Sequence, residues 1–106
     1  MKKILVILLS MFFTSLAIAE TVWIDVRTAE EYNQDHINGD IRISYEEIVP
    51  NVEKFVIPKN TEIHLYCKSG RRAGIAMSKL KEAGYTNVSN SGGIDDARKE
   101  RSLLKN

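Results

Sequence analysis

Cysteine is nearly absent from this sequence of 106 residues, which contains only Cys67. A single cysteine cannot form a disulfide within the chain, so a fold held together by internal disulfides is excluded. In an exported protein, an odd cysteine indicates either an intermolecular bridge or a reactive thiol. The alternative is a buried, inert cysteine that packs like a small hydrophobic residue. Composition alone leaves these alternatives open.

The sequence also lacks an excess of positive or negative charge. Its two histidines and its cysteine are not spaced as the ligands of a metal site. Removal of Lys2 and Lys3 with the N-terminal segment would reduce the 15 basic residues to 13, against 14 acidic ones, for a net charge of −1. This balance gives no support for a nucleic acid or an anionic membrane as a partner. Internal repeats and low-complexity segments are absent as well.

The N-terminus carries one apolar run, from Ile4 to Ile18, preceded by Met1-Lys2-Lys3. It closes with Ala17-Ile18-Ala19 before Glu20, which is typical of a secretory signal peptide cleaved after Ala19. The competing interpretation is a membrane anchor, for which the run is short. No cysteine follows it, so a lipoprotein is not indicated. We expect residues 1–19 to be removed and residues 20–106 to be one small domain, soluble in the periplasm.

Signals for strands and helices alternate along this domain. Runs rich in β-branched and aromatic residues predict strands at 22–26, 40–44 and 62–66, and residues 85–88 lead to another short strand. Ser91-Gly92-Gly93 then predicts a flexible turn. Strands that alternate with helices indicate an α/β domain with a mostly parallel central sheet flanked by helices.

Helix signals are equally local. Thr28 and Glu31 form a capping box for a helix over residues 29–35, and Ser44 and Glu47 form a second, for a short helix that Pro50 is expected to limit. Ala73, Ala76, Met77, Leu80 and Ala83 give residues 70–83 one apolar stripe. Gly84 is expected to cap this helix, and a terminal helix is expected from Asp95 to Leu104.

Cys67 therefore falls where a parallel strand ends and the longest helix is about to begin. Ligands of open α/β sheets bind beyond the carboxyl ends of the strands. The loop Lys68–Arg72 can curl so that its N–H groups point at the sulfur, and Gly70 supplies the freedom for a tight curl. A helix N-terminus and three basic side chains add positive potential, which favours the thiolate form of Cys67. The pattern predicts an anion site with a nucleophile at its base.

The length of the loop distinguishes two kinds of reaction that use a cysteine in such an anion site, phosphate hydrolysis and sulfur transfer. A cysteine-dependent phosphatase needs the spacing Cys-x5-Arg, whereas Cys67 and Arg72 are spaced as Cys-x4-Arg. The loop is one residue short for phosphate and suits a smaller group, such as a sulfur atom carried on the cysteine. A cation at the start of a helix opposes the helix dipole, so we expect Arg72 to serve anion binding rather than stability.

Three separated motifs resemble the rhodanese family of sulfurtransferases over essentially all of residues 20–106. "WIDVRTAEEYNQDHINGDI" is similar to the family's Asp-x-Arg-x-x-x-Glu-aromatic pattern followed by His-Ile-x-Gly, and it is matched by Asp25, Arg27, Glu31, Tyr32, His36, Ile37 and Gly39. "CKSGRRA" is similar to the active-site loop, with Lys68 where Arg is common, and "NVSNSGG" is similar to the third motif. The departures are Asp40, Ser44, Asn90 and the absence of Trp after Gly93, none of which touches the loop.

The resemblance implies a rhodanese-like domain in which Cys67 is catalytic and the loop residues Lys68, Ser69, Gly70, Arg71 and Arg72 bind substrate. It implies ping-pong covalent catalysis: Cys67 takes sulfur from thiosulfate or a similar donor as a persulfide, then passes it to cyanide or a thiol. Lys68 and Arg72 are expected to hold the anionic donor, and Arg71 either shares this role or points to solvent. No metal or organic cofactor is implied, and we expect a monomer.

One alternative function stays open, and the remaining polar and aromatic residues are given structural interpretations. A persulfide carrier or thiol-binding module that serves one partner needs the same loop. Asp25, Arg27 and Glu31 are predicted to form a buried ion pair or hydrogen-bond set. His36 is predicted to be structural, and His64 a satisfied or partly exposed side chain. Trp23 and the tyrosines are predicted to be core or surface anchors.

Overall fold

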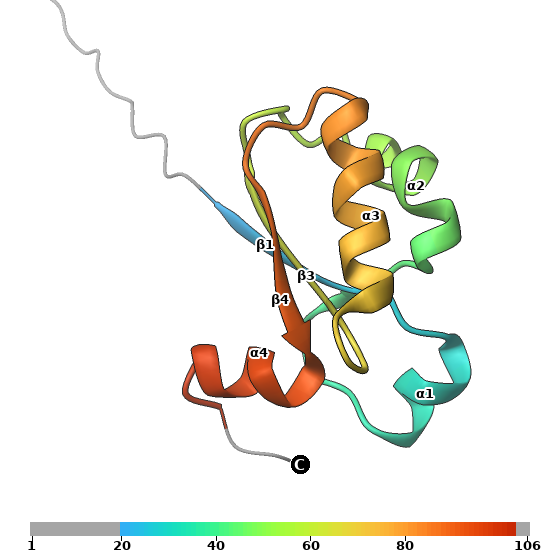
Figure 1. The fold of residues 1–106 in the computed structure, drawn as a ribbon, viewed down its shortest axis with the longest axis vertical. Coiled ribbons are helices and arrows are strands. Elements are labelled where there is room, and N and C mark those ends of the chain that lie inside the picture. Colours follow the sequence, from blue (N-terminus) through green and yellow to red (C-terminus); the bar gives the residue numbers. More distant parts are fainter. Residues whose placement is uncertain (1–19, 104–106) are drawn as a thin grey trace, which may run out of the picture.

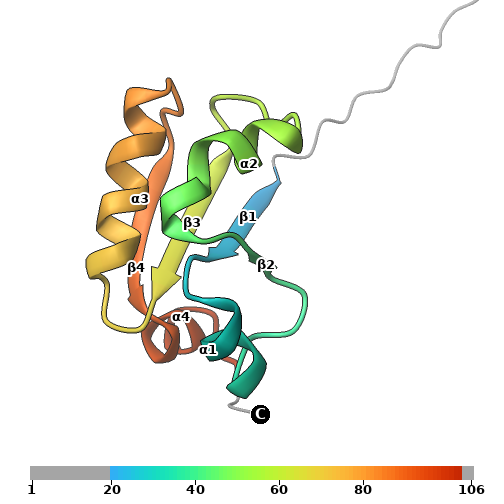
Figure 2. The same cartoon turned by 90° about the vertical axis from the view of Figure 1, so that its right-hand side faces the viewer.

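Four parallel strands form a single sheet in the order β2-β1-β3-β4. Figure 1 labels β1, β3 and β4, and Figure 2 shows all four strands side by side. The structure is a computed structural model that describes residues 20–103. The strands are β1 (Thr21–Asp25), β2 (Ile41–Arg42), β3 (Glu62–Cys67) and β4 (Val88–Gly93). The predicted α/β class and parallel sheet are confirmed. The predicted signal peptide and Leu104 lie outside the described residues, and within residues 20–103 no helix is long and apolar enough to cross a membrane.

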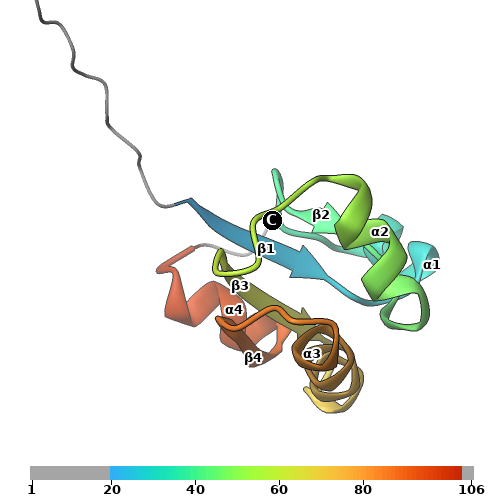
Figure 3. The same ribbon diagram turned by 90° about the horizontal axis from the view of Figure 1, so that it is seen from above.

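The helices lie on both faces of the sheet and around its carboxyl end. They are α1 (Ala29–Gln34), the 3-10 turn η2 (Tyr45–Glu47), α2 (Ile48–Lys54), α3 (Arg71–Glu82) and α4 (Ile94–Glu100). Helices α2 and α3 cover one face, whereas α4 lies on the other side of the sheet (Figure 3). The strands β1, β3 and β4 all point toward α1 and α4, so the loop that follows β3 lies at that end (Figure 2). This is the edge of the sheet where the sequence places the site.

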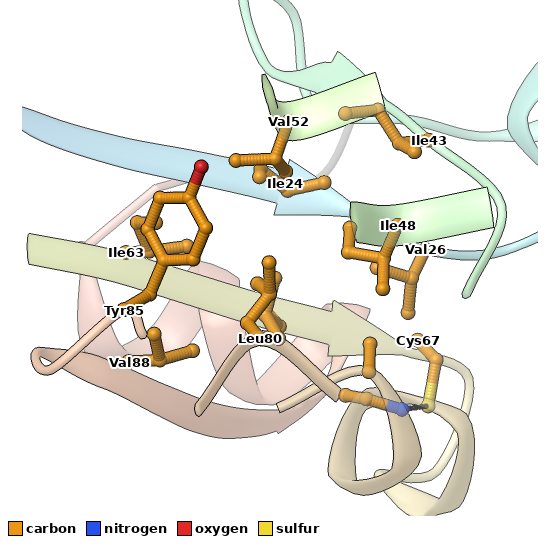
Figure 4. Packing of buried hydrophobic residues seen from close by; sticks show 13 residues of the cluster. Ile24, Val26, Ile43, Ile48, Val52, Ile63, Cys67, Leu80, Tyr85 and Val88 are labelled. Carbon is orange, nitrogen blue, oxygen red and sulfur yellow. Dashed lines mark hydrogen bonds between the residues drawn. The ribbon is translucent and has the colours of Figure 1, made fainter. Parts of the chain in front are cut away.

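The main hydrophobic core lies between the sheet and the pair α2 and α3 (Figure 4). The predicted stripe of α3 is confirmed, because Ala73, Ala76 and Leu80 are buried and Met77 and Ala83 pack partly buried against the same cluster. A fully buried Leu or Ile contributes about 1.5–3 kcal/mol, so this layer holds α3 and the loop before it. A smaller cluster on the opposite face joins α4 to β3 through Ile37, Tyr66, Ile94 and Ala97.

The capping box predicted at Thr28 and Glu31 is confirmed, whereas the one predicted at Ser44 and Glu47 is wrong. The Thr28 hydroxyl accepts from the Glu31 amide at 3.1 Å, and the Glu31 carboxylate accepts from the Thr28 amide at 3.0 Å. Ser44 instead accepts from the Glu46 amide at 3.4 Å and starts η2. The prediction that Pro50 ends this helix is wrong, because Pro50 is the third residue of α2. In the first turn the missing N–H has no intrahelical partner to lose.

The two glycine predictions have opposite outcomes. Gly84 follows α3 with φ +102°, and the Tyr85 amide donates to the Leu80 carbonyl at 3.0 Å, so the predicted cap is confirmed. The predicted flexible turn at residues 91–93 is wrong, because β4 continues to Gly93, which pairs with Cys67. Glycine in a strand marks a place where another backbone approaches closely, and here that backbone belongs to the Cys67 loop.

Candidate active site

Cys67 is the last residue of β3 and is only 1 % exposed. Its Sγ accepts two backbone hydrogen bonds, from the N–H of Gly70 at 2.9 Å and from that of Ala73 at 3.4 Å; Figure 4 shows the sulfur bonded to a backbone nitrogen at the edge of the core. Gly70 adopts φ +102°, a left-handed conformation that glycine reaches without steric cost. The loop amides therefore turn toward the sulfur. Two N–H donors stabilise a thiolate, and a cysteine that only fills space does not need them.

The basic side chains of the loop differ in whether they form an ion pair with a carboxylate. Lys68, Ser69 and Arg71 are exposed, whereas Arg72 is half-buried at the start of α3. Among residues 20–103, neither Lys68 nor Arg71 forms an ion pair with a carboxylate. Their charges thus stay available to an anion that approaches Cys67 from solvent, and the role of these residues in donor binding remains a prediction.

Arg72 forms a bidentate ion pair with Glu31 of α1. Its Nη1 and Nη2 donate to the two carboxylate oxygens at 2.8 and 3.0 Å, and the side chains are 18 % and 26 % exposed. The hydrogen bond to Glu31 raises the pKa of Arg72, and the charge of Cys67 raises it further. The expectation that Arg72 serves anion binding rather than stability did not include this ion pair, which gives Arg72 a structural contact as well. It joins α1 to the start of α3 beside the cysteine loop.

The same contact lowers the pKa of Glu31 to about 2, from an ordinary value of 4.5. The Arg72 hydrogen bond is the main cause, and the Thr28 amide adds to it against the opposing effect of burial. Ionised Glu31 therefore stabilises the fold fully above pH 4.5, and this stabilisation disappears as the pH falls through about 2.

Glu31→Gln is expected to lower the free energy of unfolding at pH 7 by about 1–2 kcal/mol, since it removes a charge-assisted pair of hydrogen bonds. The difference from the unsubstituted protein should shrink between pH 4.5 and 2, as urea unfolding at a series of pH values would measure. Glu30→Gln is the matched control, because Glu30 is an exposed residue of the same helical turn. A difference that persists unchanged at pH 2 would contradict the assignment.

The end of β4 supports the loop from behind, a role that sequence reasoning missed. A Cβ on Gly93 would overlap the carbonyl oxygen of Lys68, and a Cβ on Gly70 would lie 3.4 Å from the Cα of Gly92. Space therefore excludes a larger residue at Gly93, whereas at Gly70 it is the positive φ that disfavours one. The side chain of Asn90 also reaches the loop, so the expectation that this departure from the family pattern does not touch the loop is wrong. The glycine pair of the third motif was the available signal for this contact, although it was interpreted as a turn.

Two of the structural interpretations are supported by contacts away from the sulfur. Asp25 and Arg27 form a buried pair, with Nε to Oδ1 at 2.9 Å and Nη2 to Oδ2 at 2.8 Å, but Glu31 is not part of it. The ring of His36 lies 2.9 Å from the Tyr32 carbonyl oxygen and stacks on the Tyr32 ring. Both groups organise the turn between β1 and β2 rather than reach Cys67.

His64 and Trp23 lie together on the face of the sheet opposite α2 and α3. The His64 ring stacks on Trp23 at 4.2 Å and bonds the Glu62 carboxylate at 2.6 Å. Arg101 lies over the Trp23 ring at 4.2 Å. These contacts agree with a satisfied His64 and an anchoring Trp23.

Neither a group of metal ligands nor the surface cleft described next offers an alternative to the Cys67 loop as the site, among residues 20–103. Within residues 20–103, no three His, Cys, Asp or Glu side chains are grouped so as to hold a metal ion. A surface cleft of about 570 Å³ lies at the amino end of the sheet, where Val22, Phe55, Val56 and Asn87 are among its lining residues. It contains no residue of the Cys67 loop, and its volume gives no reason to place the chemistry there.

Comparison with known proteins defines the class. The rhodanese-like domain family matches residues 14–100, so the chain belongs to that family. The thiosulfate sulfurtransferase PspE of Escherichia coli is 40% identical over 88 residues, which cover 83% of this chain and 85% of that protein. A putative sulfur carrier protein, YrkF of Bacillus subtilis, is 36% identical over 67 residues, 63% of this chain and 35% of its own length.

Solved structures give the same answer for the fold. A structure described as a rhodanese with anions from E. coli superposes with a TM-score of 0.72 at 38% identity, and the match covers 82% of this chain and 98% of that one. The rhodanese-3-like domain of Alr3790 from Anabaena superposes with a TM-score of 0.70 at 25% identity. That match covers 82% of this chain and 99% of the Anabaena domain.

Proposed function

We propose that this protein is a thiosulfate sulfurtransferase that works through a persulfide on Cys67. The observation that carries the proposal is the Cys67 sulfur, which accepts N–H bonds from Gly70 and Ala73 inside a Cys-x4-Arg loop. Identity of 40% to a thiosulfate sulfurtransferase over most of both chains supports the choice of donor. Cyanide or a thiol is the acceptor, and the protein works as a monomer without a metal or organic cofactor.

The first half-reaction moves one neutral sulfur atom. The Cys67 thiolate attacks the outer sulfur of thiosulfate, an S–S bond forms to the enzyme, and the original S–S bond of the donor breaks. Sulfite leaves with the bonding electron pair. The thiolate and thiosulfate together carry a charge of −3, and so do the products, a persulfide anion and sulfite. No proton or external oxidant is required.

The second half-reaction regenerates the Cys67 thiolate. Cyanide or a thiolate attacks the outer sulfur of the persulfide, and Cys67 leaves as the thiolate that started the cycle. The loop N–H groups serve both halves, because each half begins or ends with negative charge on sulfur. Lys68, Arg71 and Arg72 are assigned to donor binding and to the charge on departing sulfite, with Ser69 and Gly70 forming the rest of the loop.

Export is part of the proposal, because residues 1–19 have the basic start, apolar run and Ala-x-Ala ending of a signal peptide. The domain would then act in the periplasm as residues 20–106. Its donor and acceptor would be small molecules or thiols of that compartment.

A persulfide carrier is the second candidate, favoured by the likeness to a putative sulfur carrier over 67 residues. A carrier would accept sulfur on Cys67 and release it to one protein partner, with little turnover on small acceptors. The loop geometry suits both functions, so they differ in kinetics rather than in structure.

Intact-mass measurement before and after addition of thiosulfate tests both candidates. We expect a gain of one sulfur atom, its loss when cyanide is added, and steady formation of thiocyanate under turnover. A gain of sulfur without turnover would favour the carrier. No gain at all would reject the persulfide mechanism and both candidates with it.

A further inference from the structure

The side chain of Asn90 connects β4 to the cysteine loop. Its Nδ2 donates to the carbonyl oxygen of Gly70 at 2.9 Å, and its Oδ1 accepts from the amide of Gly92 at 2.8 Å. The two ends of one planar amide are therefore used on two different segments. The family resemblance places an apolar residue here, so the contact is a property of this chain that the loop motif alone does not explain.

Gly70 provides the shorter of the two backbone hydrogen bonds to the Cys67 sulfur. Its N–H donates to Cys67 Sγ at 2.9 Å, while its carbonyl accepts from Asn90 and from the Gly74 amide at 2.9 Å. The left-handed conformation of Gly70, with φ +102° and ψ −18°, links these two peptide groups. Glycine has wide conformational freedom, so this conformation needs an external constraint to stay fixed. A bond to the carbonyl limits rotation about ψ.

Asn90 is an exposed residue whose side chain lies against the start of α3. The Asn90 Nδ2 lies 3.4 Å from the position of a Cβ on Gly74 and 3.9 Å from that of a Cβ on Gly70. Both glycines therefore leave room for the Asn90 side chain against the start of α3. Gly92, which donates to Asn90, is itself in backbone contact with Gly70. Asn90, Gly92 and Gly74 thus surround the carbonyl side of Gly70, the residue whose N–H meets the sulfur.

We propose that Asn90 is a positioning residue for Cys67, one that holds the Gly70 carbonyl and thereby the backbone conformation of Gly70, so that the N–H of Gly70 remains directed at the sulfur. The inference rests on the proposed function for its catalytic meaning, but the positioning itself concerns the thiolate of the free protein. An aspartate would lose the N–H donor that meets the Gly70 carbonyl and would add negative charge near the sulfur. An alanine would lose both hydrogen bonds without adding charge.

The test is the pH profile of Cys67 alkylation by iodoacetamide, which reports the thiolate and requires no sulfur transfer. Asn90→Asp is expected to move the midpoint of this profile upward by about one pH unit, which is about a tenfold loss of alkylation rate below the midpoint. Asn90→Ala should move it in the same direction by less. The catalytic efficiency of both variants with thiosulfate should fall, by about tenfold for the aspartate.

Asn87→Asp is the matched control, since it places the same charge on an exposed residue at the other end of β4. Its alkylation profile should superpose on that of the unsubstituted protein. Profiles of Asn90→Asp and Asn90→Ala that also superpose would overturn the positioning role, whether or not turnover changes. Shifted profiles in a protein that never gains sulfur from thiosulfate would keep the positioning role and reject the proposed function instead.

Discussion

Cys67→Ser is expected to abolish transfer of sulfur from thiosulfate to cyanide while it leaves the fold intact. A serine hydroxyl accepts the same N–H bonds from Gly70 and Ala73, but it does not ionise near neutral pH and forms no persulfide. Because Cys67 is buried, replacement of sulfur by the smaller and more polar oxygen should cost about 1 kcal/mol of stability. Thiocyanate formation and urea unfolding measure the two effects separately.

A small aryl phosphate provides the specificity control for this variant. The spacing from Cys67 to Arg72 encloses too small a site for phosphate, so the unsubstituted protein should hydrolyse it no faster than Cys67→Ser does. Phosphate hydrolysis that depends on Cys67, or sulfur transfer that survives in Cys67→Ser, would each contradict the assignment.

Arg72→Ala is expected to reduce catalytic efficiency with thiosulfate more than tenfold, because the loss of one charge-assisted contact to a dianion costs about 2 kcal/mol. The structure adds a second effect that the sequence did not predict. The variant also breaks the ion pair with Glu31, so it should lose about 1–2 kcal/mol of stability as well. Lys68→Ala, at an exposed position without a carboxylate partner among residues 20–103, should show a smaller kinetic effect and almost no change in stability.

Glu31→Gln separates the two roles of Arg72. It breaks the ion pair but keeps the guanidinium beside Cys67, so it should match Arg72→Ala in stability and retain most of the activity. Equal kinetic losses in the two variants would mean that Arg72 acts only by holding α1 against the loop. Unchanged thiosulfate kinetics in Arg72→Ala would remove Arg72 from the donor site.

Local signals in the sequence predicted most of the fold. The capping box at Thr28 and Glu31, the apolar stripe of α3 and the cap at Gly84 each depend on residues within one or two helical turns, and all three are present. Pro50 was misinterpreted because a proline in the first turn of a helix looks the same in sequence as one that ends a helix. Helix boundaries depend on which turn the proline occupies.

The site was predictable only in its central part. The position of Cys67 at a strand end and the curl at Gly70 follow from residues 63–73 alone. The partner of Arg72 lies 41 positions earlier in the chain, and the Asn90 contact lies 20 positions beyond Gly70. Neither pair has a local pattern, because tertiary packing of α1 and β4 brings the groups together. The interpretation of residues 91–93 as a turn failed for the same reason.

The burial of Cys67 has a consequence for redox chemistry. An exposed lone cysteine in an oxidising compartment is captured by other proteins as a mixed disulfide. Disulfide exchange needs access of a third sulfur to the thiolate, so we expect a thiol that is 1 % exposed beneath its own loop to form mixed disulfides with folded proteins more slowly than an exposed thiol does. We therefore expect small anions and small thiols to reach the sulfur more readily than a folded protein does. Burial should likewise slow the crosslinking of two copies of the chain through Cys67, which would help to keep this thiol reduced.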